Sequence, residues 1–409
     1  MAPANALIDV LLTGLDGLAL LIVVGLPVRW LGLLVLSLLD WNRQRAHRTP
    51  DLAHPVPLTV VVPAYNEARV IRRTVECLLG SQGVEVTVLV VDDGSRDATA
   101  DEVRQIEDPR VHLLVQEPNQ GKARALNRGF GEARTDLVVT VDADTLVEET
   151  CLAWLVAAQQ RSKAAAVASN VRVGNRRRLL AMLQSLEYVA SLHLDRRAQN
   201  LLGVITTIPG AAALWRRDVV VEHGGFSPDT LAEDTDLCVT LLRTDQTLVF
   251  EARAWAFTEV PSTLGGLWRQ RRRWLWGNLA CIWKHGWPWS APWRVRFLAL
   301  PNLWFAHIGV YLVPVLAALL GWWHRDDLAR ALIAPWATTL LVIDAVSLIA
   351  LTLADRSRGR DLIVAPLQRL VWPLLLGTVF VSTWLWPPRS WATIARTGRA
   401  ERQRRLIPR

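Results

Sequence analysis

The chain of 409 residues is too apolar for a single soluble globular protein, because 51% of its residues are hydrophobic and its mean hydropathy is +0.20. Charged residues make up only 21% but give a net charge of +8, which predicts a negatively charged partner such as nucleic acid, anionic lipid or a phosphorylated small molecule. The four cysteines have no CxxC spacing, which argues against a zinc site or a disulfide scaffold and predicts buried, reduced thiols: Cys77, Cys151, Cys238 and Cys281.

An apolar run from Leu7 to Leu39 opens the chain, and a basic cluster that ends at Arg48 follows it. We expect one membrane-spanning helix here rather than a cleaved signal peptide, because no basic stretch precedes the run and no small-residue cleavage site follows it. Lys and Arg concentrate on the cytoplasmic side of membrane spans, so the next part of the chain is expected in the cytosol. Residues 1–55 are interpreted as an N-terminal transmembrane helix with a basic linker.

Short β-branched runs then alternate with helical patterns. The runs are LTVVVP at 58–63, VEVTVLVVDD at 84–93, VHLLVQ at 111–116 and DLVVTVDAD at 136–144. Nearly continuous Val and Leu runs joined by crossover helices indicate an α/β domain with a mostly parallel sheet covered on both faces. We assign this domain to residues 56–262. The absence of GxGxxG after the first strand disfavours a dehydrogenase-type dinucleotide fold, and no P-loop is present.

Acidic residues end two of these strands, at the edge where α/β sheets bind ligands. Asp142 and Asp144 lie two apart, and such hard oxygen donors suit Mg²⁺ or Mn²⁺ shared with phosphate oxygens. A solvated turn or a helix cap is the alternative for this pair. Asp92 and Asp93 end another strand, and their alternative role is a turn with an N-cap for a helix that begins near Ala98.

Two later motifs contain candidate catalytic and substrate-binding residues. Glu233 and Asp234 precede an apolar helical pattern, where an ionised carboxylate is a candidate general base toward a sugar hydroxyl. The preference of acidic residues for a helix N-terminus is the alternative. The QRRRW motif at 270–274 offers arginines that neutralise a leaving diphosphate and, in Trp274, a flat face for a sugar ring. A membrane-surface patch is the alternative for this motif.

Residues 263–298 mix basic side chains with seven tryptophans. This composition suits amphipathic helices that lie in the membrane plane, and a soluble amphipathic helix packed on its own domain is the alternative. Three apolar stretches follow within residues 299–388, and each is long enough to span a bilayer as a helix: Leu300–Trp322, Ala331–Ala354 and Leu362–Trp386.

The Arg-rich tail of residues 389–409 conflicts with three complete spans. Such a topology would place the tail outside, against the tendency of basic segments to stay in the cytosol. We therefore expect Leu362–Trp372 to be re-entrant or interfacial, with an elbow at Pro373, and the tail to be cytosolic.

Six motifs occur in order between Leu58 and Trp276: VVPAYNE, VDDGS, NQGKARALNRG, VDAD, AED and QRRRW. This set resembles the family 2 glycosyltransferases, in particular the membrane-embedded processive polysaccharide synthases. The stretches PSTLGGLWRQRRRW and ASNVRVGN are most similar to those of bacterial poly-β-1,6-N-acetylglucosamine synthases. The oligochitin, hyaluronan and cellulose synthases share the same ordered motifs less closely. The resemblance implies a cytosolic GT-A type domain flanked by transmembrane and interfacial helices in the cell membrane.

The resemblance also implies roles for individual residues. Asp234 would be the catalytic base, with Glu233 beside it. The donor-binding residues would be Tyr65, Glu67, Asp92, Asp93, Lys122, Asp142, Gln270 and Arg273. The acceptor-binding residues would be Trp274, Pro209 and Gly210, and the residues that hold Mg²⁺ or Mn²⁺ would be Asp142 and Asp144. Ala232 departs from the family pattern, because many relatives have threonine there, which leaves the acceptor contacts open.

The activity implied is an inverting, processive transfer from UDP-N-acetylglucosamine to a β-linked polysaccharide that leaves through the membrane. Expected partners are the UDP-sugar donor, the growing polysaccharide and membrane lipids. A small accessory membrane subunit stays open as a partner, and nucleic acid is not expected. One alternative is a non-processive transferase that adds one sugar to a lipid or lipid-linked acceptor. A transport or scaffold protein with an inactive domain is another, which the intact Asp142, Asp144, Asp234 and Arg273 argue against.

Overall fold

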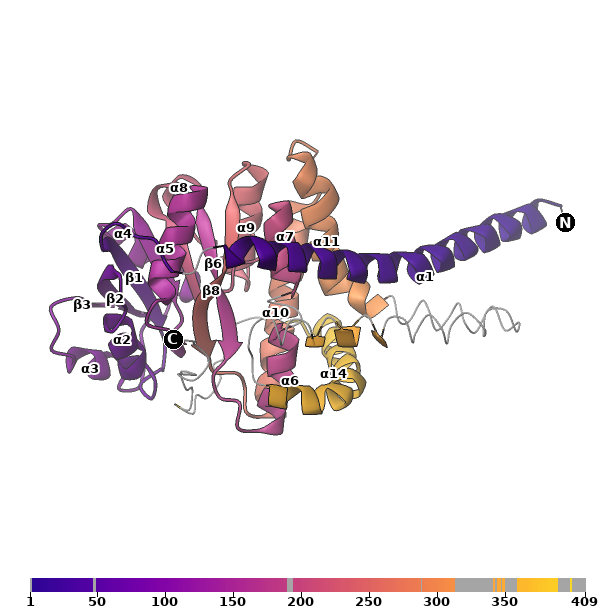
Figure 1. The fold of residues 1–409 in the computed structure, drawn as a ribbon. Helices are drawn as coiled ribbons and strands as arrows, with labels where there is room; N and C mark the ends of the chain where they lie inside the picture. Colours follow the sequence, from indigo (N-terminus) through magenta and orange to yellow (C-terminus); the bar gives the residue numbers. More distant parts are fainter. Residues whose placement is uncertain are drawn as a thin grey trace.

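An eight-stranded sheet with helices packed on both faces forms the body of the protein, and a long N-terminal helix extends from it (Figure 1). The computed structural model describes residues 2–46, 49–189, 194–287, 289–312, 341–342, 344–346, 348–349, 359–388 and 398. The strands are β1 Val56–Ala64, β2 Val84–Asp92, β3 Val111–Val115, β4 Leu137–Val141, β5 Thr145–Val147, β6 Ala166–Val173, β7 Ala212–Arg216 and β8 Leu248–Thr258.

The helices of the body lie mostly between these strands. They are α2 Ile71–Leu79, α3 Thr99–Arg104, α4 Lys122–Glu132, α5 Cys151–Ser162, α6 Leu179–Tyr188, α7 Asp195–Leu202, α8 Arg217–Glu222, α9 Glu233–Arg243 and α10 Leu264–His285. The described helices at the two ends of the chain are α1 Ala2–Arg45, the π-helical turns Val295–Ala299 and Phe305–Gly309, α11 Leu300–Trp304, the 3₁₀ helix Gly359–Val364 and α14 Ala365–Leu385.

The sheet is mixed, in the strand order β3-β2-β1-β4-β7-β6-β8-β5. Its first four strands are parallel, as predicted. Beyond β4, β7 is antiparallel to both of its neighbours, β6 and β8 are parallel, and β5 is antiparallel to β8. Four of the seven pairings are therefore parallel. The direction changes because β7 starts beside the end of β4, where the Asp142 N–H donates to the Ala211 carbonyl at 3.1 Å.

Alternating side chains of β1 enter two hydrophobic cores, one on each face of the sheet. Val60 packs with Ile71 of α2 and Leu152 of α5 on one face. Val61 packs with Leu126 of α4 and with buried residues of α9 and α10 on the other face. Full burial of each such aliphatic side chain contributes roughly 1.5–3 kcal/mol. These cores hold the strand ends, and the loops that follow them, in fixed positions.

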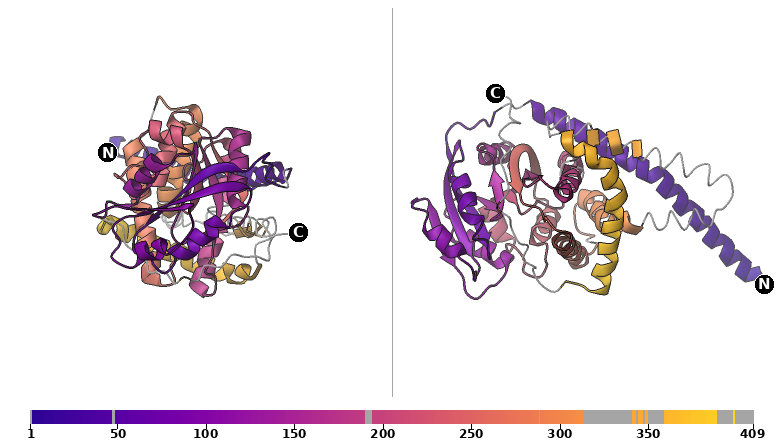
Figure 2. Two further views of the ribbon diagram at one scale, coloured as in Figure 1. Left: turned by 90° about the vertical axis from the view of Figure 1, so that its left-hand side faces the viewer. Right: turned by 90° about the horizontal axis from the view of Figure 1, so that it is seen from below.

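Three described helices are long and apolar enough to cross a membrane: Val24–Arg45, Val295–Leu312 and Asp361–Leu385. They overlap three of the stretches expected from the sequence. The fourth expected span, Ala331–Ala354, lies mainly outside the described residues. In both Figure 1 and Figure 2, α1 reaches well beyond the other described elements.

The chain stays helical at Pro373, where the sequence predicts an elbow. Helix α14 continues from Ala365 to Leu385 with Pro373 inside it. A proline removes one backbone hydrogen bond from a helix, but in an apolar segment the other backbone groups still need intrahelical partners, which favours continuing the helix. The helix is therefore not interrupted at Pro373, and the re-entrant or interfacial placement of Leu362–Trp372 stays a prediction.

The last turns of α1 are anchored to the body through buried polar contacts. The Asp40 carboxylate accepts hydrogen bonds from Arg197 Nη1 at 2.9 Å and from Asn200 Nδ2 at 2.6 Å, both on α7. The Gln44 side chain donates to the Phe250 carbonyl at 3.0 Å and accepts from the Ala252 N–H at 3.1 Å, so it continues the hydrogen bonding of β8. This helix is thus docked on α7 and β8.

Helix α10 packs on α9 and on α14. A stripe of its residues is buried against the body from Gly266 to His285, and it includes Gln270 and Arg271. Exposed tryptophans begin near its end, at Trp283, and continue beyond it. This part of the predicted amphipathic segment thus contains one helix integrated into the fold, while its orientation in the membrane plane stays a prediction.

Candidate active site

Loops with predicted functional residues meet at one edge of the sheet. The strand register pairs Ala64 of β1 with Asp92 of β2, and Val61 of β1 with Thr140 of β4. The segments after these parallel strands therefore leave the sheet on the same side. The contact of Asp142 with Ala211 brings the Pro209–Gly210 segment to the same edge.

Asp93 organises the loop before α4. Its Oδ1 accepts hydrogen bonds from Gln116 Nε2 at 2.5 Å and from the Gln120 N–H at 2.8 Å. Its Oδ2 accepts from the Gly121 N–H at 2.7 Å. Gly121 has φ +92°, a conformation that favours glycine. The carboxylate therefore fixes the turn that delivers Lys122 to the site.

The other residues predicted at the first two strand ends also lie in interlocked loops. Asp92 Oδ1 accepts from the Ser95 N–H at 3.1 Å, which is the turn contact given above as its alternative role. The Glu67 N–H donates to Thr99 Oγ1 at 2.8 Å. Tyr65 is half-buried, next to Asn66 with its positive φ of 56°. Tyr65, Glu67, Asp92 and Asp93 thus share one loop cluster at the sheet edge.

Lys122 lies at the centre of the predicted site. Its Nζ is 2.5 Å from Asp142 Oδ1 and 3.5 Å from Glu233 Oε1. Burial alone would lower the pKa of Lys122, but the carboxylates of Asp142, Glu233 and Asp234 outweigh it and raise this pKa above the usual value. The lysine is therefore held as a cation among carboxylates from β4 and α9.

Gly210 closes one side of this cluster. A Cβ atom at this position would lie 2.8 Å from Lys122 Nζ and 3.9 Å from Asp142 Oδ1, so a side chain there would displace the lysine. The Gly210 N–H is also close enough to the Asp234 carboxylate to lower the pKa of Asp234. The predicted acceptor segment thus lies directly beside Lys122 and near the predicted base.

The two neighbouring carboxylates at the start of α9 differ in exposure. Glu233 is buried and Asp234 is half-buried. Burial, with help from Asp234, raises the pKa of Glu233 to about 7 despite the opposing effect of Lys122. Burial also raises the pKa of Asp234, which Lys122 and the N–H groups of Thr235 and Gly210 partly offset. Asp234 is the carboxylate that a ligand can reach more readily.

Asp144 follows Asp142 inside a turn, because the Thr145 N–H donates to the Asp142 carbonyl at 3.0 Å. The backbone is thus not extended between the two aspartates. Asp144 is buried, and its Oδ1 accepts long hydrogen bonds of 3.4 Å from the hydroxyls of Thr145 and Thr258. No group of three or more His, Cys, Asp or Glu side chains suited to a metal occurs among the described residues.

The QRRRW motif lies on α10, and its side chains reach toward α6. Arg271 Nη1 donates to Gln270 Oε1 at 2.8 Å, and Arg271 Nη2 binds the Glu187 carboxylate of α6. The Arg271 guanidinium also covers the Trp274 ring at 4.2 Å from its centroid, and Tyr188 lies on α6 with its ring centroid 6.5 Å from that of Trp274. Arg273 is half-buried on the same helix.

Close contacts fix α10 against the start of α9. Thr235 Oγ1 donates to Asn278 Oδ1 at 2.9 Å, and Thr230 Oγ1 donates to the Gly277 carbonyl at 3.0 Å. Further along, Lys284 Nζ and His285 Nε2 lie 3.0 and 2.8 Å from the two Asp236 oxygens. The QRRRW motif and the Glu233–Asp234 pair are thus parts of one packed unit.

Sequence reasoning missed three charged residues near this unit. Arg271 binds Glu187 and covers the Trp274 ring. The helical spacing of Leu267, Arg271 and Trp274 could have indicated that these residues share a face. Arg196 of α7 is buried and interacts electrostatically with Asp234. No motif marked it.

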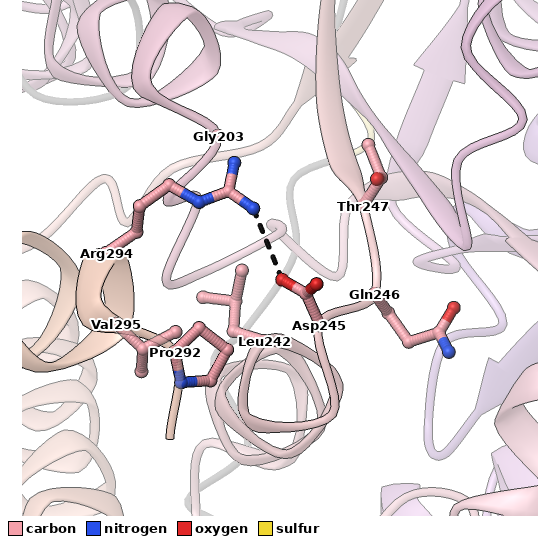
Figure 3. Close-up of a pocket in the computed structure, with 8 residues that line it drawn as sticks. All are labelled: Gly203, Leu242, Asp245, Gln246, Thr247, Pro292, Arg294 and Val295. Atoms are coloured by element: carbon pink, nitrogen blue, oxygen red, sulfur yellow. Dashed lines mark hydrogen bonds and ion pairs between the residues drawn. The ribbon is translucent and has the colours of Figure 1, made fainter. Parts of the chain in front are cut away.

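A small pocket elsewhere contains none of the predicted site residues. It lies between the end of α9 and the segment before the Val295–Ala299 turn, beside Asp245 and Arg294, which form an ion pair of 3.2 Å (Figure 3). The residues that line this pocket belong neither to the predicted donor loops nor to the QRRRW motif.

Residues 59–224 match the sequence model of the family described as Glycosyl transferase family 2. The matched region includes the predicted donor-binding residues in the loops that follow the first four strands. It also includes the Pro209–Gly210 segment. The chain therefore carries a family 2 glycosyltransferase domain, as the ordered motifs predicted.

Two curated relatives are poly-beta-1,6-N-acetyl-D-glucosamine synthases. That of Staphylococcus aureus (strain COL) is 32% identical over 223 residues, which cover 54% of each chain. That of Staphylococcus epidermidis (strain ATCC 35984) is 30% identical over 233 residues, which cover 56% of this chain and 57% of the relative. The chain thus spans about half the length of the curated relatives it matches.

The fold is similar to that of a solved mannosyltransferase from Pyrobaculum calidifontis, in complex with GDP-Man and Mn²⁺. The TM-score is 0.62 at 20% identity, and the match covers 90% of this chain and 99% of the other. The architecture is therefore that of a GT-A-like glycosyltransferase with a mixed sheet, accompanied by helices apolar enough to span a membrane.

Proposed function

We propose that this chain, through its family 2 glycosyltransferase domain, is an inverting processive transferase that polymerises UDP-N-acetylglucosamine into a β-linked polysaccharide and passes it across the membrane. The observation that carries the proposal is the cluster in which Lys122 joins Asp142 to Glu233 and has the Gly210 backbone directly beside its ammonium. Groups expected to bind donor and acceptor thus lie within one cluster of charged side chains and backbone.

Asp234 suits the role of general base. It is more accessible than Glu233, and its Oδ1 accepts a hydrogen bond from the Thr235 N–H at 2.8 Å. In the proposed reaction the acceptor hydroxyl gives its proton to Asp234, and its oxygen bonds to the anomeric carbon of the donor. The bond from that carbon to the diphosphate breaks, and UDP leaves with the electron pair. A single in-line displacement inverts the anomeric configuration.

Asp142 and Asp144 are the residues proposed to hold Mg²⁺ or Mn²⁺. Their fit is supported by the chemistry of the oxygens and by the ammonium that Asp142 Oδ1 already binds at 2.5 Å, since this position attracts a cation. The diphosphate would supply the remaining oxygen ligands. When bound, such an ion neutralises the charge that develops on the leaving diphosphate.

The chain's own cations support departure of the diphosphate as well. Lys122 lies beside Asp142 at the sheet edge, and Arg273 lies on α10 next to Trp274. We propose that Lys122, Gln270 and Arg273 bind the diphosphate and that Tyr65, Glu67, Asp92 and Asp93 surround the nucleoside. Trp274 offers its ring to the acceptor end of the polysaccharide, beside Pro209–Gly210.

The processive part of the proposal rests on the named relatives and on the apolar helices. The relatives are synthases of poly-beta-1,6-N-acetyl-D-glucosamine, and three described helices have the length and composition of membrane spans. In the proposed arrangement these helices lie in the cell membrane, with the transferase domain in the cytosol, and they conduct the polymer.

The test measures UDP release by the full chain in lipid nanodiscs, with Mg²⁺ or Mn²⁺. The donors are UDP-N-acetylglucosamine, UDP-glucose, UDP-glucuronate and UDP-galactose, and the products are sized on a gel. We expect metal-dependent release with UDP-N-acetylglucosamine and a long product. A product of one sugar on lipid would favour the non-processive activity, and no release with any donor would contradict the proposal.

A further inference from the structure

The second residue of the QRRRW motif, Arg271, is held at two of its nitrogen atoms. Its side chain is 5% exposed. Nη2 binds the Glu187 carboxylate of α6, and Nη1 donates to Gln270 Oε1 at 2.8 Å. A guanidinium is planar and its N–H donors have fixed directions. Contacts through two of its nitrogens therefore fix the orientation of the plane as well as its position.

This fixed guanidinium covers the ring of Trp274. The distance from the guanidinium carbon to the ring centroid is 4.2 Å, within the range in which a cation is attracted to an aromatic face. Arg271 and Trp274 are three residues apart on α10, a spacing that brings two side chains together on one helix face. The indole of Trp274 is thus held by a side chain that Glu187 holds in turn.

Trp274 also has contacts that connect it to the proposed acceptor side. Asn278 Nδ2 donates to the Trp274 carbonyl at 2.8 Å, and Asn278 Oδ1 accepts from Thr235, the residue after the proposed base. The Trp274 ring packs against a buried cluster that contains Ala211, which follows Gly210. The side chain is only half-buried, so part of the ring surface stays open to a ligand.

The helix that carries Glu187 is anchored independently of the QRRRW motif. Ser185 of α6 donates to Asp361 Oδ2 at 2.6 Å, and Arg176 binds the same oxygen at 2.8 Å. Leu183 of α6 lies in one core cluster with residues of α10 and α14, and Figure 1 shows these three helices together. Glu187 therefore holds Arg271 from a fixed support.

We propose that Arg271 is a positioning residue, which Glu187 and Gln270 hold in place so that its guanidinium keeps the Trp274 ring in the orientation that receives the acceptor saccharide. The inference rests on the proposed function and adds a residue outside the predicted donor and acceptor sets. A ring that is fixed before binding loses less conformational freedom when a sugar stacks on it. Arg271 thus acts on acceptor affinity through Trp274.

The experiment compares the wild-type chain in nanodiscs with Arg271→Ala, Arg271→Lys and the double variant Glu187→Gln/Arg271→Ala. Calorimetry measures the affinity for a β-1,6-linked N-acetylglucosamine tetramer. Release of the ring should weaken tetramer binding by roughly 3- to 10-fold in Arg271→Ala. Lysine keeps the charge beside the ring but not the planar guanidinium, so the affinity of Arg271→Lys should lie between those of Arg271→Ala and wild type.

The double variant separates positioning from stability. Arg271→Ala leaves Glu187 without its cation, whereas the double variant leaves no unpaired charge and should melt at a higher temperature than Arg271→Ala. If the ion pair only stabilised the fold, tetramer affinity would recover together with the melting temperature. We expect that it does not recover, because the Trp274 ring remains uncovered.

Ser185→Ala is the matched control on the same helix. It removes the buried hydrogen bond to Asp361 and should lower the melting temperature with unchanged tetramer affinity.

Three outcomes would overturn the inference: wild-type tetramer affinity in the double variant, an equal loss of affinity in Ser185→Ala, or no tetramer binding by the wild-type chain. Absence of UDP release from every donor would instead overturn the proposed function. The tetramer titration would still decide the role of Arg271, because it requires no turnover.

Discussion

The ammonium of Lys122 lies 2.5 Å from Asp142 Oδ1, on the carboxylate proposed to share a divalent cation. The same ammonium is 3.5 Å from Glu233 Oε1, so one lysine links β4 to the start of α9. A Cβ atom at Gly210 would lie 2.8 Å from Nζ, so the backbone of the proposed acceptor segment lies directly beside this cation. The donor and acceptor sides of the proposed reaction are therefore coupled through Lys122.

Replacing Lys122 with methionine should reduce both activity and stability. The buried Glu233 carboxylate would lose its cation, and removal of one partner from such a cluster should lower the free energy of unfolding by ~2 kcal/mol. UDP release should fall by about 100-fold or more, because a cation placed near developing charge is lost. Lys122→Arg, which keeps the charge, serves as the control in the UDP-release assay. Equal rates for wild type and Lys122→Met would exclude this role.

Asp234→Asn should abolish proton transfer while preserving nucleotide binding. We expect UDP release to fall by ~10³-fold, within the range for loss of a general base, with unchanged UDP affinity by calorimetry. In the wild type, kcat/KM should decline on the acidic side at a pH above the ordinary aspartate pKa, because burial raises the pKa of Asp234 and the base must be ionised. Unchanged turnover in Asp234→Asn, or a stronger loss in Glu233→Gln, would contradict the assignment.

Glu233 should make stability depend on pH. Its folded-state pKa of about 7 exceeds the ordinary 4.5, so the folded state binds the proton more tightly. Its stabilising contribution is fully present below pH ~4.5 and is lost as pH rises through 7, by up to ~3 kcal/mol. Without metal or donor, the melting temperature of the wild type should fall relative to Glu233→Gln between these pH values. Parallel melting curves across this window would refute the prediction.

The sequence predicted the sheet edge well because the period and composition of its strands are local signals. The Val-rich runs located β1 to β4, and the rule that parallel strands end on one side brought Tyr65, Asp93 and Asp142 together. The antiparallel placement of β7 could not be read in the same way. It depends on the contact of Asp142 with Ala211, between segments about 70 residues apart.

The sequence also did not predict the separate roles of neighbouring charged residues. The QRRRW motif indicated arginines near Trp274, but it did not indicate which of them binds Glu187. In the structure Arg271 does so. Asp92 and Asp93 looked alike as strand-end carboxylates, yet one makes a local turn and the other holds the loop before Lys122. Such differences depend on long-range partners, which a local pattern does not contain.

Gly277 should be essential for the close packing of α10 against the segment that precedes α9. A Cβ atom there would lie 2.7 Å from the backbone of Leu231 and Ala232, immediately before Glu233, and backbone atoms in a packed core cannot move aside cheaply. Gly277→Ala should therefore lower the free energy of unfolding by ~2 kcal/mol and reduce UDP release, since the shift displaces Asp234 relative to Trp274.

Gly265 provides the matched control on the same helix. Its Cβ would meet only the end of the Arg269 side chain, at an ordinary 3.6 Å. Gly265→Ala should be neutral or stabilising by up to ~1 kcal/mol, because alanine favours the helix. Melting temperature and UDP release measured for both variants separate a helix-propensity effect from a contact effect. If Gly277→Ala behaved like Gly265→Ala, close contact between α10 and the loop before Glu233 would not be required for activity.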